Sequence, residues 1–338
     1  MSLNKKYFKK IRLDELDRNN NWRKDFAEKH NKTSQKIISQ CKEVLICPVC
    51  SSSERNKYTE VFGFNFYNCN SCNHLYSGKV PSEDALKSLY AESEDDREVE
   101  SAQREIYANE KYFATRVNEI AYPKAKFASE NIQGRGLWID LGAGTGDLLI
   151  SAKKLGWETL GFESDKAQVQ FARKKGVEMF EKYLDLNREL PELKSAKITS
   201  LINVLEHLED PKKTIENISK SLNESAYFLF EVPRFPSVSS FANKCFPETS
   251  ARNIYSPDHL HLFSDKSIKL ILDNAGFNIK SAWYFGQDIY ELFGNAACKG
   301  EIELNSSFHN FLPILNDLQK IVDMNKLSDT MLILAQKK

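Results

Sequence analysis

A glycine-rich turn at residues 140–146, Asp-Leu-Gly-Ala-Gly-Thr-Gly, is the first feature of the sequence that could do chemistry. It follows a short apolar run and precedes an amphipathic one, a pattern that predicts a strand, a tight turn and a helix. Glycine lets a backbone approach a ligand closely, and open α/β sheets bind ligands beyond the carboxyl ends of their strands. We therefore expect Gly142, Gly144 and Gly146 to contact a cofactor.

Two acidic residues indicate which cofactor this is. Glu163 ends the next predicted strand, 23 residues after Asp140, where a carboxylate can accept hydrogen bonds from both ribose hydroxyls. In a dinucleotide-binding fingerprint, the third glycine would stand at the position of Asp147, whose charge is unfavourable beside a pyrophosphate. Asp140 suits a cationic amine. The pattern therefore favours S-adenosyl-L-methionine over NAD.

Four of the seven cysteines form two closely spaced pairs, Cys47 with Cys50 and Cys69 with Cys72, with 18 residues between the pairs. This spacing is typical of a tetrahedral four-thiolate zinc site. Four protein ligands leave no open position, so the Zn²⁺ would be structural rather than catalytic. His74 could substitute for one ligand, but we expect it at the surface.

Three of the six histidines fall in two short motifs. His207 follows the fourth predicted strand and could act as a general base, with Glu206 orienting it. His259 and His261 alternate with leucines, so an extended segment would place both on one side, facing His207 across the cleft. Alternatively, Glu206, His207 and a downstream histidine could hold a divalent cation, or the histidines could be loop residues bonded to the backbone.

Further candidates are less specific. Aromatic residues near the sixth predicted strand could form an acceptor wall, although core packing explains at least half of them. Two polar residues that follow could bind hydroxyls, and three residues ahead of the glycine turn could form a lid. These three sets are Trp283, Tyr284, Phe285 and Tyr290; Gln287 and Asp288; and Tyr107, Tyr112 and Arg116.

Positioning these residues requires alternating strands and helices, which is the α/β pattern. Helices are expected at 147–155, at 165–175 with Ser164 as N-cap, after the cap Asp210, and from the cap Ser264 to Gly276. Seven strands are expected, at residues 137–141, 159–163, 177–180, 198–204, 226–232, 277–285 and 331–335.

Length and composition suggest a globular protein of about two domains, since 338 residues include 41% hydrophobic and 28% charged residues. We expect an N-terminal helical extension at 1–43 and a zinc-binding module at 44–80. A helical linker or lid should follow at 81–130. Residues 131–338 would form the α/β domain, with a helical insertion near 287–325.

The charge balance argues against nucleic acid as a partner, because 47 basic and 47 acidic residues leave no net charge. The sequence has no run of eighteen apolar residues, so no membrane span is expected, and the lysine-rich start lacks the apolar stretch of a secretory signal. A cytoplasmic location is therefore expected.

Several segments resemble class I S-adenosylmethionine-dependent methyltransferases. LWIDLGAGTGDLL and LGWETLGFESD resemble motif I and the next strand, INVLEHLEDPKKTI the fourth-strand region, FLFEVP the fifth, and DHLHLFS the approach to the sixth. The resemblance covers residues 131–338 and implies a Rossmann-like, seven-stranded, doubly wound sheet with a small zinc-ribbon-like module ahead of it. EMFEKYLDLN, in the third-strand region, lacks the family's adenine-contact signature.

The same resemblance implies roles for individual residues. The glycine turn and Asp140 would line the methionine part of the cofactor, Glu163 would bind the ribose, and Asn203 would flank the cofactor. In the metal-using RNA enzymes a further glutamate usually stands where this chain has Asn203. That departure favours the general-base role of His207.

The arrangement of two cysteine pairs ahead of such a core resembles that of enzymes of nucleotide-sugar and surface-polysaccharide modification, including sugar C-methyltransferases. This implies methylation of a small molecule, a nucleotide-linked sugar or saccharide, in polysaccharide or secondary-metabolite biosynthesis. The Leu-Glu-His motif also resembles O-methyltransferases that act on phenolic or RNA 2′-hydroxyl acceptors. A cofactor-binding scaffold without catalysis is a third interpretation, against which the intact glycine turn and Glu163 argue.

Overall fold

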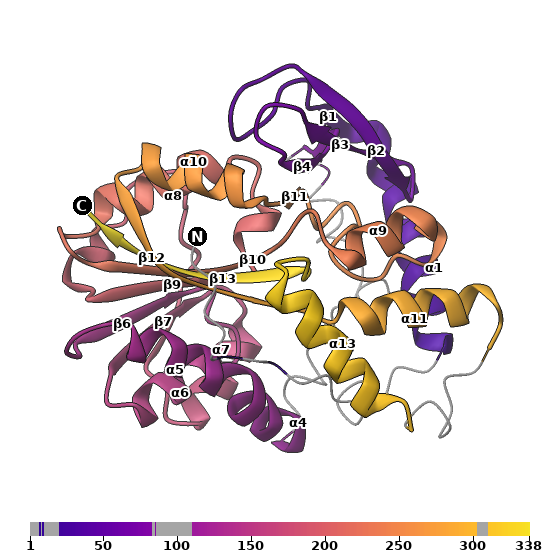
Figure 1. Ribbon diagram of the computed structural model, residues 1–338. Helices are drawn as coiled ribbons and strands as arrows, with labels where there is room; N and C mark the ends of the chain where they lie inside the picture. Colours follow the sequence, from indigo (N-terminus) through magenta and orange to yellow (C-terminus); the bar gives the residue numbers. More distant parts are fainter. Residues whose placement is uncertain (1–6, 8, 10–19, 83–84, 86–109, 303–309) are drawn as a thin grey trace.

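The computed structural model describes residues 7, 9, 20–82, 85, 110–302 and 310–338 (Figure 1). Its centre is a seven-stranded sheet in which β10, β9, β6, β7 and β8 are parallel and β13 runs antiparallel to both of its neighbours. In sheet order the strands are β12 (Phe277–Phe285), β13 (Thr330–Lys337), β10 (Tyr227–Pro233), β9 (Ile198–Ile202), β6 (Leu137–Leu141), β7 (Glu158–Glu163) and β8 (Met179–Glu181).

Helices cover both faces of this sheet, as Figure 1 shows. One face packs against α5 (Tyr122–Glu130), α6 (Asp147–Lys154) and α7 (Lys166–Lys174). The other packs against α8 (Pro211–Ser221) and α10 (Asp265–Asn274). Because both faces are covered, every residue of β10 is buried, which explains its nearly continuous apolar sequence.

The helix starts follow local capping chemistry. The Ser264 hydroxyl accepts a hydrogen bond from the Ser267 N–H in a capping box, and the Asp210 carboxylate caps α8, as expected. The expected cap of α7 was wrong. Asp165, not Ser164, is the N-cap, and its carboxylate accepts hydrogen bonds from the first-turn amides of Ala167 and Gln168.

The strand bounds differ from expectation mainly at the ends. The fourth strand stops at Ile202 rather than at residue 204, because Asn203 adopts a left-handed conformation with φ of +53°. Asparagine tolerates this region better than most residues. The turn ends the strand directly beside the glycine turn of the next strand in the sheet.

The paired cysteines lie in a small β module, residues 41–81, which we call the cysteine module. Its strands are β1 (Cys41–Glu43), β2 (Arg55–Val61), β3 (Phe64–Cys69), β4 (Leu75–Ser77) and β5 (Lys79–Pro81). A short strand from the α/β domain, β11 (His261–Leu262), pairs antiparallel with β4 and completes a four-stranded sheet. Of the helical extension expected at residues 1–43, most of residues 1–19 lie outside the described residues, Asn20–Ile37 form helix α1, and residues 41–43 form a strand.

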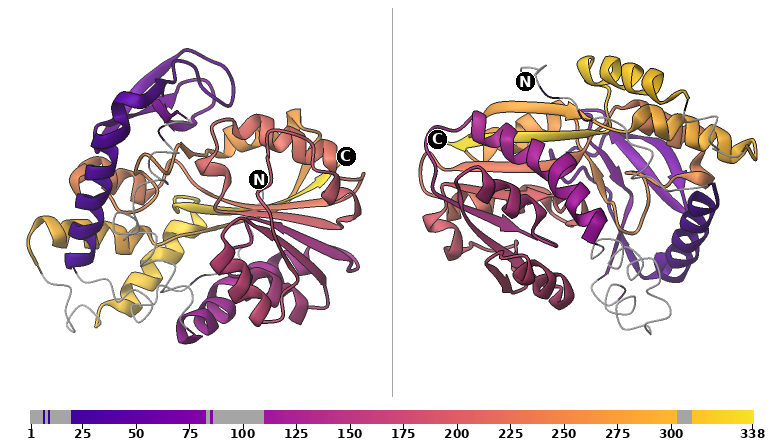
Figure 2. Two further views of the ribbon diagram at one scale, coloured as in Figure 1. Left: turned by 180° about the vertical axis from the view of Figure 1, so that it is seen from behind. Right: turned by 90° about the horizontal axis from the view of Figure 1, so that it is seen from below.

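A helical cluster lies beside the cysteine module, as Figures 1 and 2 show. It comprises α1, α9 (Val238–Cys245), α11 (Asp288–Lys299) and α13 (Leu312–Met324), and α11 contacts the other three. A buried ion pair of 2.9 Å between Arg23 Nη1 and Glu291 Oε2 joins α1 to α11. Residues 110–121, α4 (Glu110–Thr115) and a π-helical turn (Arg116–Ala121), lead into α5.

None of the helices in the described ranges combines the length and the hydropathy that a membrane span requires.

Candidate active site

The glycine turn between β6 and α6 has the backbone that its sequence predicts. Gly142, Gly144 and Gly146 all have positive φ, at 68°, 53° and 77°. Residues with a side chain rarely adopt positive φ values, and a Cβ atom at Gly142 would lie 3.0 Å from Val204 Cγ2. The turn therefore requires glycine for both conformation and space.

Glu163 lies at the end of β7 with its carboxylate fixed by backbone amides. Its Oε2 accepts a hydrogen bond from the Gly144 N–H at 3.0 Å. Its Oε1 accepts hydrogen bonds from the amides of Ser164 and Asp165, at 2.7 and 2.8 Å. These contacts hold the carboxylate beside the glycine turn.

Asp140 is buried at the end of β6 and accepts a hydrogen bond from the Ser200 hydroxyl. Burial raises the pKa of its carboxyl to about 7, although the Ser200 hydrogen bond opposes the rise. Nearby Asp147 and Glu163 add to it. A cationic ligand group beside Asp140 would favour the ionised carboxylate.

A cavity of about 520 Å³ opens over the glycine turn. This volume is within the usual range for ligand pockets, and polar side chains make up most of its wall. They come from the N-terminal segment, α5, the end of β6 and the glycine turn, the loop after β9, β10, residues 251–259 and the segment after β12. The polar lining side chains include Lys9, Lys124, Asp140, Thr145, Asn203, Glu206, His207, Glu231, Arg252, Tyr255, His259 and Gln287.

A second, smaller pocket of about 190 Å³ shares Gly142 with this cavity. Its wall is mostly apolar and includes Phe162, Leu184, Leu186 and Val204, with Glu163 at its edge. The sequence analysis did not predict this apolar pocket. The sequence feature that could have indicated the pocket is the alternation of Leu184 and Leu186, in the segment that lacks the family's adenine-contact signature.

Glu206 and His207 lie in a 3₁₀ turn (Leu205–His207) directly after β9. Glu206 is 1% exposed, and burial raises its pKa to about 7. His207 Nε2 lies 4.0 Å from Glu206 Oε1, and His207 Nδ1 lies 2.8 Å from the Asp258 carbonyl oxygen. Because a carbonyl only accepts, Nδ1 carries the hydrogen and Nε2 keeps its lone pair in neutral His207.

His259 joins this pair. Its ring centroid lies 4.8 Å from that of His207, and the ligand atoms of Glu206, His207 and His259 all lie within 4.8 Å of one another. Both His259 nitrogens make protein contacts, at 3.1 Å to the Asn253 carbonyl oxygen and at 2.9 Å to the Tyr255 hydroxyl. Burial keeps the pKa of His259 well below its usual value. Both nitrogens of His259 are therefore engaged by the protein, whereas among the described residues only Nδ1 of His207 has a hydrogen-bond partner.

His261 does not face His207 across the cavity. It lies in β11, where Nε2 donates to the Leu208 carbonyl at 2.8 Å and Nδ1 lies 3.1 Å from His74 Nε2. The extended segment covers only residues 261 and 262, so the expected alternation with His259 does not hold. The expectation that His74 lies at the surface was also wrong, since His74 is completely buried.

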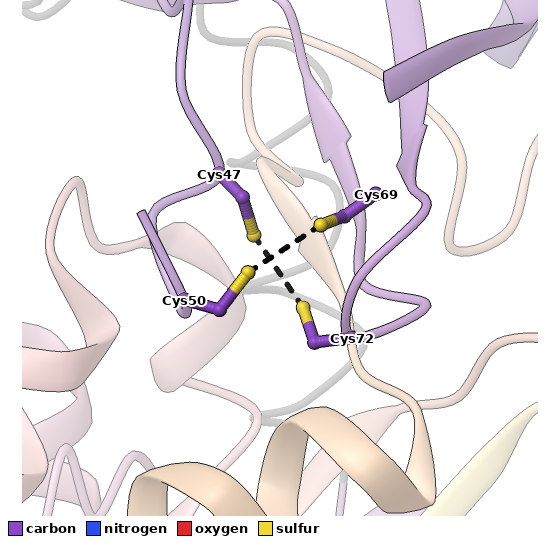
Figure 3. Close-up of side chains that lie close together, drawn as sticks. All are labelled: Cys47, Cys50, Cys69 and Cys72. Atoms are coloured by element: carbon purple, nitrogen blue, oxygen red, sulfur yellow. Dashed lines mark hydrogen bonds between the residues drawn. The ribbon is translucent and has the colours of Figure 1, made fainter. Parts of the chain in front are cut away.

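The four paired cysteines converge, as Figure 3 shows. Cys47 Sγ lies 3.6 Å from Cys72 Sγ, and Cys50 Sγ lies 3.4 Å from Cys69 Sγ. All four sulfur atoms lie within 4.8 Å of one another. Thiolates at about 2.3 Å from a tetrahedral Zn²⁺ would be about 3.8 Å apart, so this arrangement fits the ion.

The structure separates the weaker candidates. Phe285, Gln287, Tyr112 and Arg116 line the large cavity, and Tyr107 lies outside the described residues. Trp283, Tyr284 and Tyr290 are buried and absent from its wall. Asp288, expected to bind hydroxyls, is buried and accepts hydrogen bonds from the backbone amides of Ser239 and Asp329.

Comparison with known families agrees with this geometry. The model of a methyltransferase-domain family matches residues 111–282, which is half of the chain. The chain belongs to this family, and it is a class I S-adenosylmethionine-dependent methyltransferase. No curated protein sequence matches it.

Solved structures with a similar fold include three methyltransferases. A possible histamine N-methyltransferase from Thermotoga maritima is 18% identical, with 69% of this chain and 97% of that chain covered and a TM-score of 0.44. A putative methyltransferase in complex with the Trm112 activator of Haloferax volcanii is 15% identical, with 69% of this chain and 96% of that chain covered and a TM-score of 0.47. Geranyl diphosphate C-methyltransferase from Streptomyces coelicolor is 11% identical over 68% and 85%, with a TM-score of 0.42.

Proposed function

We propose that the enzyme methylates a hydroxyl-rich small molecule, a nucleotide-linked sugar or another saccharide, with His207 as the general base. One observation carries the proposal. The polar cavity joins the glycine turn to His207, whose Nε2 is left with a free lone pair by the contact between Nδ1 and the Asp258 carbonyl. A base in this position can reach an acceptor bound beside the cofactor.

The cofactor position follows from the chemistry of the two pockets. The methionine part would lie over the glycine turn, with its amine near Asp140 and with Asn203 beside it. The ribose would meet the Glu163 carboxylate at the junction of the pockets. The adenine ring would then enter the apolar pocket between Phe162 and Leu186.

The cavity wall favours an acceptor that donates hydrogen bonds. Buried oxygen atoms of Thr145, Glu206 and Gln287 have no hydrogen-bond partner within the described ranges. Buried polar atoms normally find partners, so these three would accept hydrogen bonds from a ligand. A sugar supplies several hydroxyl donors on one small ring, which is why we favour a saccharide.

In the proposed step, the bond between the methyl carbon and the cofactor sulfur breaks as the methyl carbon bonds to an acceptor oxygen or carbon. The electron pair of the broken bond remains on sulfur, which becomes a neutral thioether. The acceptor proton passes to His207 Nε2, and an ionised Glu206 nearby would stabilise the resulting imidazolium. The same base serves O- and C-methylation.

A second function is supported by the cluster of Glu206, His207 and His259, which could hold a divalent cation. Such an ion would lower the pKa of an acceptor hydroxyl, as expected for a phenolic or RNA 2′-hydroxyl acceptor. The base mechanism is favoured because both ring nitrogens of His259 already have protein partners, the Asn253 carbonyl and the Tyr255 hydroxyl.

We also propose that Cys47, Cys50, Cys69 and Cys72 bind one structural Zn²⁺. The sulfur distances support this ion, and a four-thiolate site leaves no position for substrate. The metal would stabilise the cysteine module rather than take part in methyl transfer.

The test is a methyl-transfer assay with labelled S-adenosylmethionine and separate pools of nucleoside-diphosphate sugars, catechols and short RNAs. We expect transfer to the sugar pool at a rate that rises with pH. His207→Ala should lower turnover by about 10²–10⁴-fold while the affinity for S-adenosylhomocysteine stays nearly unchanged. A chelator that leaves the cysteine-bound metal in place should have no effect.

Full activity of His207→Ala would refute the base assignment and direct attention to Gln287 and Phe285, which also line the cavity. Chelator-sensitive activity that Mg²⁺ restores would favour the metal mechanism. Transfer to catechol or RNA alone would exclude the saccharide assignment.

A further inference from the structure

Three contacts join the loop that carries Glu206 and His207 to the segment of residues 258–261. The Asp258 carbonyl accepts a hydrogen bond from His207 Nδ1 at 2.8 Å. The Leu260 amide donates to the Glu206 carbonyl at 2.9 Å. His261 Nε2 then contacts the Leu208 carbonyl at 2.8 Å. The three contacts fix the loop on both sides of the proposed base.

The same segment belongs to the sheet of the cysteine module. His261 pairs with Tyr76 of β4, and the Leu260 carbonyl accepts a hydrogen bond from the Ser77 amide at 2.9 Å. Just beyond β11, the Ser264 hydroxyl donates to the carbonyl of Cys72 at 2.7 Å. The segment therefore links the cysteine cluster to the loop that carries His207.

His74 extends this link to the second cysteine pair. Its side chain is completely buried, and its Nε2 lies 3.1 Å from His261 Nδ1. The Leu208 carbonyl can only accept, so His261 Nε2 carries the hydrogen and His261 Nδ1 accepts from His74. The His74 carbonyl in turn accepts a hydrogen bond from the Cys69 amide at 2.9 Å.

We infer that His74 and His261 are positioning residues, which connect the cysteine module to the loop of His207 and hold His207 in its productive orientation. The inference rests on the proposed role of His207. Loss of this link would leave Asp140 and Glu163 in place, because they lie on β6 and β7, outside the segment, although Val204 and Leu208 of the loop line the apolar pocket. It would release the loop and the Asp258 contact that fixes the tautomer of His207.

The test compares His261→Leu, which removes both ring contacts, with His261→Gln, which retains a donor for Leu208. Val61→Ala is the matched control, because Val61 is buried in the same module and its apolar side chain takes no part in the hydrogen bonds that link His74, His261 and Leu208. Nitrogen-15 NMR of the imidazoles reports the His207 tautomer. Hydrogen exchange reports the mobility of residues 204–209, and calorimetry with S-adenosylhomocysteine reports the cofactor site.

We expect a single His207 tautomer, protonated at Nδ1, in the wild type, in Val61→Ala and in His261→Gln. His261→Leu should give mixed tautomers and at least about tenfold faster exchange in residues 204–209, because a positioning contact is lost. Its affinity for S-adenosylhomocysteine should fall by less than about tenfold, because Asp140 and Glu163 stay in place and only the Val204 side of the apolar pocket is loosened. If His261→Leu fails to fold, His74→Leu removes the donor to His261 alone and should show the same changes to a smaller degree.

An unchanged His207 tautomer and unchanged exchange in the folded histidine variants would overturn the inference. The same changes in Val61→Ala would overturn it as well, because general loosening of the module would explain them. Failure of the proposed function is distinguishable, since His207→Ala would then keep full turnover whatever the His261 variants show.

Discussion

Replacing Glu206 with glutamine should stabilise the protein and abolish most of its activity. The carboxyl is 1% exposed, and its Oε2 has no hydrogen-bond partner within the described part of the chain. Ionising it inside the protein is therefore costly. Glutamine has the same shape and carries no charge, so the substitution isolates the cost of the buried charge.

The size of the effect follows from the pKa of Glu206. Burial raises it from 4.5 to about 7, with His207 opposing the rise and Glu231 adding to it. A tenfold change in a protonation equilibrium is worth about 1.4 kcal/mol, so the fully ionised carboxylate costs the folded state about 3 kcal/mol. The favourable contribution of the protonated form is present below pH 4.5 and is lost as the pH rises through about 7.

Urea unfolding of the wild type and of Glu206→Gln should therefore be compared at pH 5 and pH 8. At pH 8 the variant should have a free energy of unfolding about 3 kcal/mol higher, and at pH 5 the gain should be under about 1 kcal/mol. In the control Glu209→Gln, in the same loop, the free energy of unfolding should change little at either pH. A Glu206→Gln gain that is equal at both pH values, or a loss at pH 8, would refute the reasoning.

The remaining predictions concern the cofactor and the metal. Because burial raises the pKa of Asp140 to about 7, the affinity for S-adenosylhomocysteine should rise about tenfold from pH 6 to pH 8 as the carboxylate ionises to meet the amine. Asp140→Asn should bind weakly at both pH values, and calorimetry showing an unaltered pH dependence in that variant would exclude this contact. Purified protein should carry one zinc ion per chain, and Cys69→Ser should lose it and destabilise the cysteine module far more than the methyltransferase core. Elemental analysis and limited proteolysis test this, with Cys245→Ser, an exposed cysteine outside the cluster, as the control expected to keep its zinc.

The central sheet was predictable because its signals are local. Strands β6 and β12 have the bounds expected from their apolar runs, at Leu137–Leu141 and Phe277–Phe285. The glycine turn, Asp140 and Glu163 follow from strand ends that parallel pairing must place together. The two cysteine pairs were recognisable by spacing, and the structure brings their sulfur atoms together.

Features that depend on contacts between distant segments were not predictable. The two-residue strand His261–Leu262 exists because β4, almost 190 residues earlier, presents an unpaired edge to it. No local pattern shows that His261 would bond to His74 rather than face His207. Both Ser164 and Asp165 can cap a helix, and Asp165 is the cap of α7 because its carboxylate accepts hydrogen bonds from the Ala167 and Gln168 amides, while Glu163 at the end of β7 holds the Ser164 amide.

The central claim is that this site binds S-adenosylmethionine at the glycine turn with Glu163 on its ribose. Calorimetry with S-adenosylhomocysteine tests it most directly, using the wild type, Glu163→Ala and the control Glu158→Ala at the other end of β7. We predict micromolar binding, about −8 kcal/mol, for the wild type and for Glu158→Ala. We predict binding at least about tenfold weaker for Glu163→Ala, since hydrogen bonds to a charged group are lost. Unchanged affinity in Glu163→Ala, or tight binding of NAD in place of S-adenosylhomocysteine, would contradict the account.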